Sequence, residues 1–169
     1  IFLTPPMMNF LKNDEELAVI LGHEYAHNLM GHIDAQQKNA MAGILLGTTL
    51  DILAAAGGYG TGSLFSDVGG HIGARSFSQE FENEADYIGL YIAANAGFNI
   101  THAADIWRRM SLKDERMIYT ATTHPTNSHR FLALSKTIAE IKQKKERGIA
   151  LLPEFRPKEN TQNQKPSRQ

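Results

Sequence analysis

The chain has 169 residues, a formal net charge of −1 and a sequence pI near 6.7. This length can bury a hydrophobic core in one domain or two without covalent staples. The balanced charge excludes the strongly basic surface that nucleic-acid binding requires. The absence of cysteine excludes disulfides and thiolate metal ligands. Since the chain opens on Ile1 within an apolar run, we expect it to lack an N-terminal portion.

The predicted elements begin with a short apolar segment and a long helix. Residues 1–6 are apolar and end in two prolines, which favours the end of a strand or an extended entry. Asn13 can cap the helix that follows, which we expect over about residues 14–33. Acidic residues occupy its first turn, where the helix dipole stabilises them, and apolar residues recur at helical spacing.

The next segment is unusually apolar. Residues 40–56 contain only a pair of threonines and Asp51 as polar side chains. The run is shorter than the roughly 20 residues that span a bilayer, so we favour a buried helix. A membrane-touching or mobile lid helix is the alternative. The glycine-rich residues 57–63 and 69–73 are predicted to be flexible loops, and the lysine of a phosphate-binding loop does not follow them.

Three further helices are expected, over residues 78–97, 101–110 and 128–148. Each starts near a residue that caps helices well, and glycine follows the first and the last of the three. The polar, proline-broken end of the chain is typical of a flexible segment. We therefore predict a domain over residues 1–152 and a flexible C-terminal extension over residues 153–169.

The first predicted helix carries the pattern HExxH. His23 and His27 are four residues apart and therefore lie on one helix face, where both imidazoles can bind one metal ion. Glu24 lies about 100° round the helix from His23 and can reach a metal-bound water without being a ligand. The spacing is that of a metallopeptidase, although HExxH alone also occurs by chance.

A zinc site needs a third protein ligand and an open position. Glu82 and Asp86 are four residues apart on the helix predicted over residues 78–97, with Glu84 between them. One carboxylate can bind the metal while the other accepts a hydrogen bond from a ligating histidine. The alternative is a solvated acidic patch near a helix start. Because HExxH lies upstream, we favour the metal site.

The longer zinc signature HExxHxxGxxH does not fit. It requires glycine and histidine where this chain has Met30 and Ile33, and Gly31 and His32 are each one place away. His32 is therefore predicted to be a capping or surface residue. The third ligand must come from elsewhere, and Glu82 is the best candidate.

Three segments together resemble one family of metallopeptidases. HEYAH (residues 23–27), ENEAD (82–86) and THPTNSHRF (123–131) resemble the gluzincins of the HtpX-like and CAAX-prenyl-protease type, in the soluble envelope branch typified by BepA. The resemblance implies a mainly α, zincin-like fold with a small residual β element, in which two central helices carry the metal ligands. The residues it matches are the ligands His23, His27 and Glu82, the general base Glu24, and Asp86, His124 and Arg130.

The resemblance also implies a function. We expect a zinc-dependent endopeptidase with one zinc ion per chain, acting on misfolded or misassembled polypeptides in the bacterial envelope or periplasm. No nucleic-acid partner is expected. Residues 40–56 are a candidate for peripheral membrane or envelope-complex association. His124 can act in two ways, as a fourth zinc ligand that closes the site or, like Tyr119, as a donor to the oxyanion of the reaction.

Two rival functions belong to other classes. The first is a non-catalytic or self-inhibited metal-binding, chaperone-like module, which requires four protein ligands and no bound water. The second is an interaction domain in which HExxH is accidental. Stoichiometric zinc in the purified chain would exclude the second.

Overall fold

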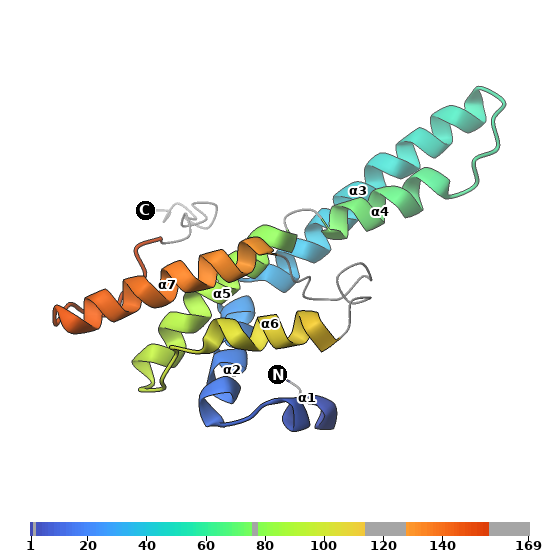
Figure 1. Cartoon of the computed structure of the whole chain (residues 1–169). Helices are drawn as coiled ribbons and strands as arrows, with labels where there is room; N and C mark the ends of the chain where they lie inside the picture. Colours follow the sequence, from blue (N-terminus) through green and yellow to red (C-terminus); the bar gives the residue numbers. More distant parts are fainter. Residues whose placement is uncertain (2, 76–77, 114–127, 156–169) are drawn as a thin grey trace, which may run out of the picture.

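The computed structural model describes residues 1, 3–75, 78–113 and 128–155, which form seven α-helices and no strand. The mainly α fold is therefore confirmed, while the residual β element is not found in this part of the chain. The helices, labelled in Figure 1, are α1 (Pro5–Phe10), α2 (Asp14–Leu29), α3 (His32–Ala56), α4 (Leu64–Arg75), α5 (Ser78–Asn95), α6 (Ala103–Lys113) and α7 (Ser128–Glu146).

The segment predicted to be a strand end contains α1 instead. Thr4 caps this helix, and its side chain accepts a hydrogen bond from the backbone N–H of Met7. Pro5 and Pro6 occupy the first helical positions, where a missing N–H costs nothing and the fixed φ of proline suits the helix. The prolines that were expected to end an extended segment therefore start a helix.

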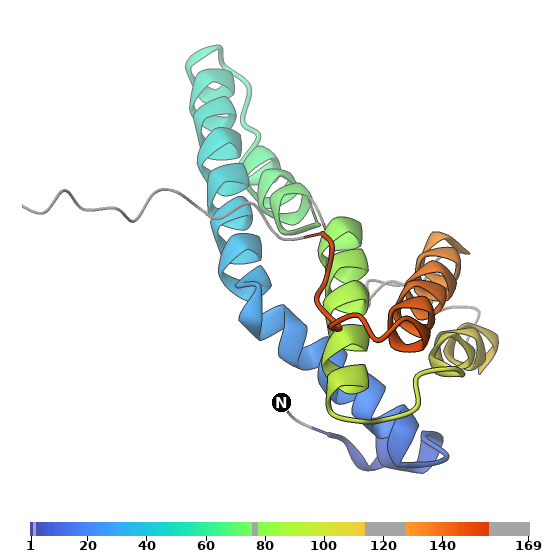
Figure 2. The ribbon, with the colours of Figure 1, turned by 90° about the vertical axis from the view of Figure 1, so that its left-hand side faces the viewer.

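Helices α2, α5, α6 and α7 pack into a bundle, and α3 and α4 project from it as a hairpin (Figures 1 and 2). The bundle holds the main hydrophobic core, to which α2, α5, α6 and α7 all contribute. Its fully buried members include Val19, Leu90, Ile106, Trp107, Leu134 and Ile141.

The backbones of α2 and α5 approach each other closely at a pair of glycines. A Cβ atom on Gly89 would lie 2.7 Å from the backbone nitrogen of His23. A Cβ atom on Gly22 would lie 2.5 Å from the carbonyl oxygen of Gly89. Only glycine allows this contact, and it places the HEYAH segment directly against the helix that carries ENEAD.

The first long helix ends earlier than predicted. Asn13 caps α2 as expected, and its side chain accepts a hydrogen bond from the backbone N–H of Glu16 at 2.9 Å. The helix stops at Leu29 rather than near residue 33, because Gly31 adopts the left-handed conformation (φ 68°, ψ 27°). A new helix, α3, then starts at His32 in another direction.

Residues 40–56 form a helix as predicted, but the prediction that this helix is buried is wrong. Most large apolar side chains of α3 are exposed, and α4 is its main neighbour. The loop predicted for residues 69–73 is also wrong, because these residues lie inside α4. There the glycines serve close helix packing, since a Cβ atom on Gly69 would lie 2.2 Å from the carbonyl oxygen of Gly43.

Helices α5, α6 and α7 are found where helices were predicted, with ends shifted by a few residues. Residues 153–155 contact the bundle, since the backbone N–H of Glu154 donates to the Tyr87 hydroxyl at 2.8 Å and Phe155 packs edge-on against the Tyr87 ring. Residues 156–169 lie outside the described part of the chain. The predicted domain boundary at residue 152 stays a prediction.

The glycine contact yields a first prediction. Gly89→Ala should lower the free energy of unfolding by about 1–3 kcal/mol, the usual cost of overpacking. This cost exceeds the gain of up to about 1 kcal/mol that alanine brings to a helix interior. Urea unfolding measures the change. The control is Asn83→Ala at an exposed position of α5. An equal or more stable Gly89→Ala variant would contradict the close contact.

Candidate metal centre

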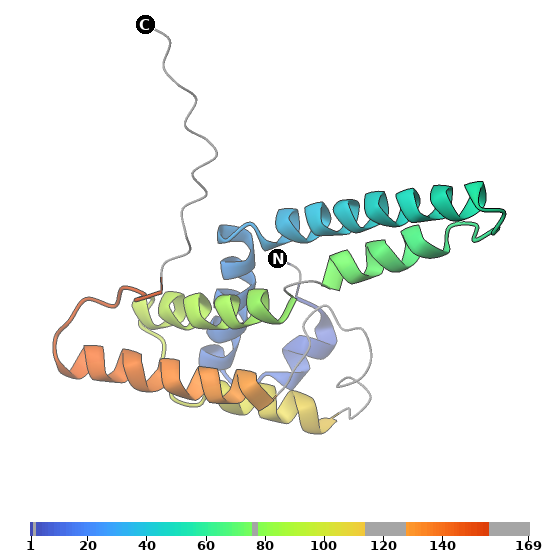
Figure 3. The ribbon, with the colours of Figure 1, turned by 90° about the horizontal axis from the view of Figure 1, so that it is seen from above.

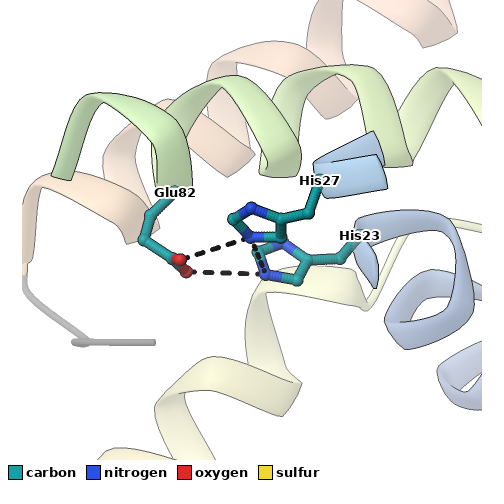
Figure 4. Close-up of side chains that lie close together, drawn as sticks. All are labelled: His23, His27 and Glu82. Carbon is teal, nitrogen blue, oxygen red and sulfur yellow. Dashed lines mark hydrogen bonds and ion pairs between the residues drawn. The ribbon is translucent and has the colours of Figure 1, made fainter. Parts of the chain in front are cut away.

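Three predicted ligands meet between α2 and α5. His23 and His27 project from α2 toward Glu82 of α5 (Figure 4). The two histidine Nε2 atoms are 3.1 Å apart. The Oε1 atom of Glu82 lies 3.2 Å from His27 Nε2, and its Oε2 atom lies 3.5 Å from His23 Nε2. All three side chains are buried.

These distances of 3.1, 3.2 and 3.5 Å lie within about 0.2 Å of those in a tetrahedral zinc site. Zinc binds histidine nitrogen and carboxylate oxygen at about 2.0–2.2 Å, so neighbouring ligand atoms of a tetrahedral site lie about 3.3–3.5 Å apart. The donor set of two imidazoles and one carboxylate is that of known catalytic zinc sites. The role of His23, His27 and Glu82 as zinc ligands stays a prediction, which this geometry supports.

Asp86 and Arg130 contact the predicted ligands and fix their positions. Asp86 Oδ1 lies 2.9 Å from His23 Nδ1, on the side of the ring away from Glu82. Arg130 of α7 binds Asp86 through two hydrogen bonds of 2.8 Å, from Nε and Nη2. Its Nη1 atom lies 2.9 Å from Glu82 Oε2. One guanidinium, only 1% exposed, thereby orients the two carboxylates that touch His23.

The electrostatics of the pocket favour a cation. Burial lowers the pKa of His23, but the hydrogen bonds and negative charges of Asp86 and Glu82 outweigh burial and raise this pKa to about 9. Two carboxylates therefore stabilise positive charge at the position that the imidazole ring faces. A bound divalent cation would receive the same stabilisation.

His32 is not the surface residue that the sequence predicts. It is 4% exposed and stacks on the Phe81 ring of α5, with ring centroids 4.5 Å apart. Its Nδ1 lies 2.9 Å from His27 Nδ1, and its Nε2 lies 2.9 Å from Glu84 Oε2. Burial lowers the pKa of His32, although the hydrogen bond to Glu84 opposes the shift. The cause of the wrong prediction is the helix break at Gly31, which turns His32 back toward His27.

The remaining predicted residues are placed as follows. Glu24 is half-buried on α2 beside the two histidines. Trp107 of α6 is buried in the core cluster. Its ring also meets His23 edge-on, with centroids 5.8 Å apart, so that α6 forms one wall of the centre. His124 and Tyr119 lie outside the described residues.

The comparison with known proteins agrees with this centre. Residues 1–138 match peptidase family M48. The chain belongs to this family. It includes all of the HEYAH and ENEAD segments within the matched range, so the prediction of a zinc metallopeptidase domain is confirmed at the level of the family. No solved structure matches the chain significantly.

Several curated relatives are metalloendopeptidases named OMA1. The mitochondrial OMA1 of Saccharomyces cerevisiae is 27% identical over 150 residues, which are 85% of this chain and 42% of the relative. The Danio rerio protein is 31% identical over 155 residues, 83% of this chain and 32% of the relative. The Homo sapiens protein is 29% identical over 152 residues, 82% and 29%. The chain thus spans less than half the length of these relatives.

One prediction from the resemblance is wrong. A bacterial envelope or periplasmic location was expected, but the matching relatives are named as mitochondrial proteases. The motifs HExxH and ExxAD indicate metal chemistry rather than location. The motifs therefore support the family while the expected location fails.

Two contacts of the centre escaped the sequence-based reasoning. His32 and Glu84 lie on different helix faces from the ligands next to them in sequence, so periodicity does not connect them. Gly31 is the signal that could have found them. A glycine directly after a predicted helix often adopts the left-handed conformation and redirects the chain.

The buried charges yield a second prediction. Arg130→Met should lower the free energy of unfolding of the metal-free chain by about 3–5 kcal/mol, because Glu82 and Asp86 lose the cation that compensates them. Saturating zinc should recover part of this loss by supplying positive charge. Thermal and urea unfolding with and without zinc measure both effects. Lys142→Met, at an exposed position of α7, is the control and should change stability by less than about 0.5 kcal/mol.

Proposed function

We propose that this chain is the catalytic domain of a zinc-dependent endopeptidase that hydrolyses polypeptides. The carrying observation is the convergence of His23, His27 and Glu82 at distances of 3.1–3.5 Å, with Glu24 beside them. Membership of peptidase family M48 supports the reaction class. Because the chain spans less than half of its curated relatives, the activity of the whole protein is part of the proposal.

The chemistry divides between the metal and the chain. Zinc, when bound, acidifies a water molecule and polarises the scissile carbonyl. Glu24 accepts a proton from the attacking water at its carboxylate and then delivers this proton to the leaving amine. Its position suits that role, because Glu24 follows a ligand directly in sequence and points about 100° away from it.

Asp86 and Arg130 prepare the ligands for this reaction. Asp86 accepts the Nδ1 proton of His23, which leaves Nε2 of the same ring free of a proton and able to bind the metal. Arg130 keeps Asp86 in place and also contacts Glu82. The proposed oxyanion donors, His124 and Tyr119, lie outside the described residues.

For the substrate, we propose a class of proteins rather than a particular protein. Misfolded or misassembled proteins are the proposed substrates, on the strength of the resemblance to HtpX-like quality-control peptidases. The HEYAH, ENEAD and THPTNSHRF segments also support a place near that branch of M48. The alternative, a non-catalytic metal-binding module, requires a fourth protein ligand, whereas three donor residues converge among the described residues.

Glu24→Gln tests the mechanism. Glutamine keeps the size of the side chain but cannot accept the proton, so cleavage of an unfolded protein such as casein should fall by at least about 100-fold. Zinc content should stay at one ion per chain. The control Glu80→Gln, at an exposed position of α5, should cleave normally.

A second variant separates metal binding from proton transfer. Glu82→Ala should lose both zinc and activity, since it removes a ligand rather than the base. Undiminished cleavage by Glu24→Gln would overturn the proposed base. Zinc retention in Glu82→Ala together with wild-type cleavage would overturn the proposed ligand set.

A further inference from the structure

The α3–α4 hairpin carries apolar side chains on the outside of nearly every face of α3. Leu45 and Leu46 are adjacent in sequence and both 69% exposed; Ile52 is 64% and Leu53 63% exposed. Adjacent helical residues point about 100° apart, so these side chains surround the helix rather than form one stripe. A helix that is apolar all round is normally buried in a protein or in lipid. Among the described residues, α3 is the one helix that is long and apolar enough, by length and composition, to cross a membrane.

The interface between α3 and α4 is formed by small residues rather than by large apolar ones. Gly43 of α3 and Gly69 of α4 face each other, while Gly47 of α3 lies against the backbone of Phe65 and Gly73 of α4 lies against that of Asn39. A Cβ atom on Gly43 would lie 1.9 Å from the carbonyl oxygen of Gly69. Small residues between helices and large apolar residues outside them are typical of helix pairs in membranes, where burying large side chains between helices brings no hydrophobic gain.

The polar side chains of residues 40–56, Thr48, Thr49 and Asp51, are satisfied within the hairpin. The hydroxyls of Thr48 and Thr49 donate to carbonyl oxygens one turn earlier, at 2.8 and 2.9 Å. Buried Asp51 accepts hydrogen bonds from the first backbone N–H groups of α4, at Phe65 (3.2 Å) and Ser66 (2.9 Å). Lipid can therefore cover α3 without leaving these groups unpaired.

The polar residues of helix α4 indicate which side of the hairpin would face water at a membrane. Asp67, His71 and Arg75 are exposed, recur every four residues, and lie on the side of α4 opposite its glycines. The apolar residues 40–56 would extend over about 26 Å, short of the roughly 30 Å of a bilayer core. The hairpin is thus suited to lying in the plane of a membrane surface, with α3 in the acyl chains and the polar stripe of α4 in water.

We propose that the α3–α4 hairpin docks this domain onto a lipid bilayer by insertion of the outer face of α3. A second copy of the chain fits less well, because one protein partner covers one side of a helix and α3 is apolar on several. The proposal does not require peptidase activity. Where the proposed function holds, it places the substrate near the membrane, because α3 continues from the helix of His23 and His27 and α4 leads into the helix of Glu82 (Figure 3).

The test is flotation with phosphatidylcholine vesicles. The wild-type chain should float with the vesicles at low and high salt alike, since the contact is apolar. The variant Leu45→Gln, Ile52→Gln, Leu53→Gln should bind at least about tenfold more weakly, in keeping with the cost of moving polar side chains into lipid. The matched control replaces three exposed leucines of the bundle, Leu112, Leu132 and Leu152, by glutamine and should float like the wild type.

Each outcome decides the proposal. Absence of wild-type flotation, equal flotation of the α3 variant, or equal loss in the control would overturn it. Sedimentation velocity tests whether a second copy of the chain covers α3 instead of lipid. If the wild type is a dimer, the α3 variant is a monomer and neither protein binds vesicles, the surface belongs to a second copy. Cleavage of a soluble peptide should be the same in all three proteins, so that a failure of the peptidase proposal is recognised separately.

A second inference comes from the contacts of His27. A metal bound at His27 Nε2 requires the ring proton on Nδ1, which faces His32 Nδ1 at 2.9 Å. His32 must then accept at Nδ1 and carry its own proton on Nε2, which faces Glu84 Oε2 at 2.9 Å. One arrangement of protons satisfies the whole chain of contacts. It gives His27 the tautomer that metal binding needs and His32 the tautomer that accepts the Nδ1 proton of His27.

We infer that His32 is a positioning residue, which together with Glu84 orients His27 for the metal. Asp86 orients His23 in the same way. Each predicted histidine ligand thus has a carboxylate partner on α5: Asp86 contacts His23 directly, and Glu84 acts on His27 through His32. The stacking of His32 on Phe81 fixes the plane of the relaying ring. This inference concerns metal binding and is independent of catalysis.

Zinc affinity, measured by competition with a chromophoric chelator, tests the role of His32. His32→Leu keeps apolar packing on Phe81 but removes the acceptor, so affinity should fall about 10–100-fold, as for other outer partners of metal ligands. His32→Asn can offer an acceptor near the position of Nδ1 and should recover most of the affinity. Glu80→Gln is the control on α5.

The melting temperature of the metal-free chain distinguishes positioning from a structural role. We expect it to be similar in His32→Leu and His32→Asn, while the zinc affinities differ. Wild-type zinc affinity in His32→Leu would overturn the inference. So would equal losses of affinity in the leucine and asparagine variants, because packing rather than the acceptor would then be responsible.

Discussion

The backbone contact between α2 and α5 at Gly22 and Gly89 is the constraint on which the metal centre depends. It brings the two helices so close that His23, the residue after Gly22, and Glu82, about two turns before Gly89, share a space of a few ångströms. Any side chain at Gly89 would push against the backbone of His23. The separation of the helices therefore sets the distance of Glu82 from the two histidines, and the 3.2 and 3.5 Å between these predicted ligands follow from it.

Charge compensation is the second requirement of this packing. Two buried carboxylates, Glu82 and Asp86, stand against two imidazoles, and α7 supplies the buried guanidinium of Arg130 between them. Burying one partner without the other costs several kcal/mol, so α7 and the centre stabilise each other. The Trp107 ring of α6 covers His23 and also lies under the Arg130 guanidinium, 5.6 Å from its centroid. The predicted ligands therefore lie on α2 and α5, and α6 and α7 enclose them.

The α3–α4 hairpin is packed in the opposite way from the bundle. The bundle places large apolar side chains inside, whereas α3 and α4 meet through glycines and leave leucine and isoleucine outside. In water such a surface is costly, and in lipid it is favourable. The break at Gly31 links the two regions, because it ends the ligand helix, starts the hairpin and returns His32 to His27. The surface proposed to contact the membrane and the candidate metal centre are therefore joined by a short segment of backbone.

The sequence by itself predicted the helices α2, α5, α6 and α7 and the donor groups proposed for the centre. Helical spacing joins His23 to His27 and Glu82 to Asp86, because residues four apart share a face whatever the fold. Tertiary structure alone decided three other features. Periodicity cannot reveal which helix covers α3, so the predicted burial was wrong. Glycines that signal loops in isolation became a helix interface in α4 once α3 lay beside them. His32 joined the centre because Gly31 turned the chain, and the direction of such a turn depends on packing between helices rather than on local sequence.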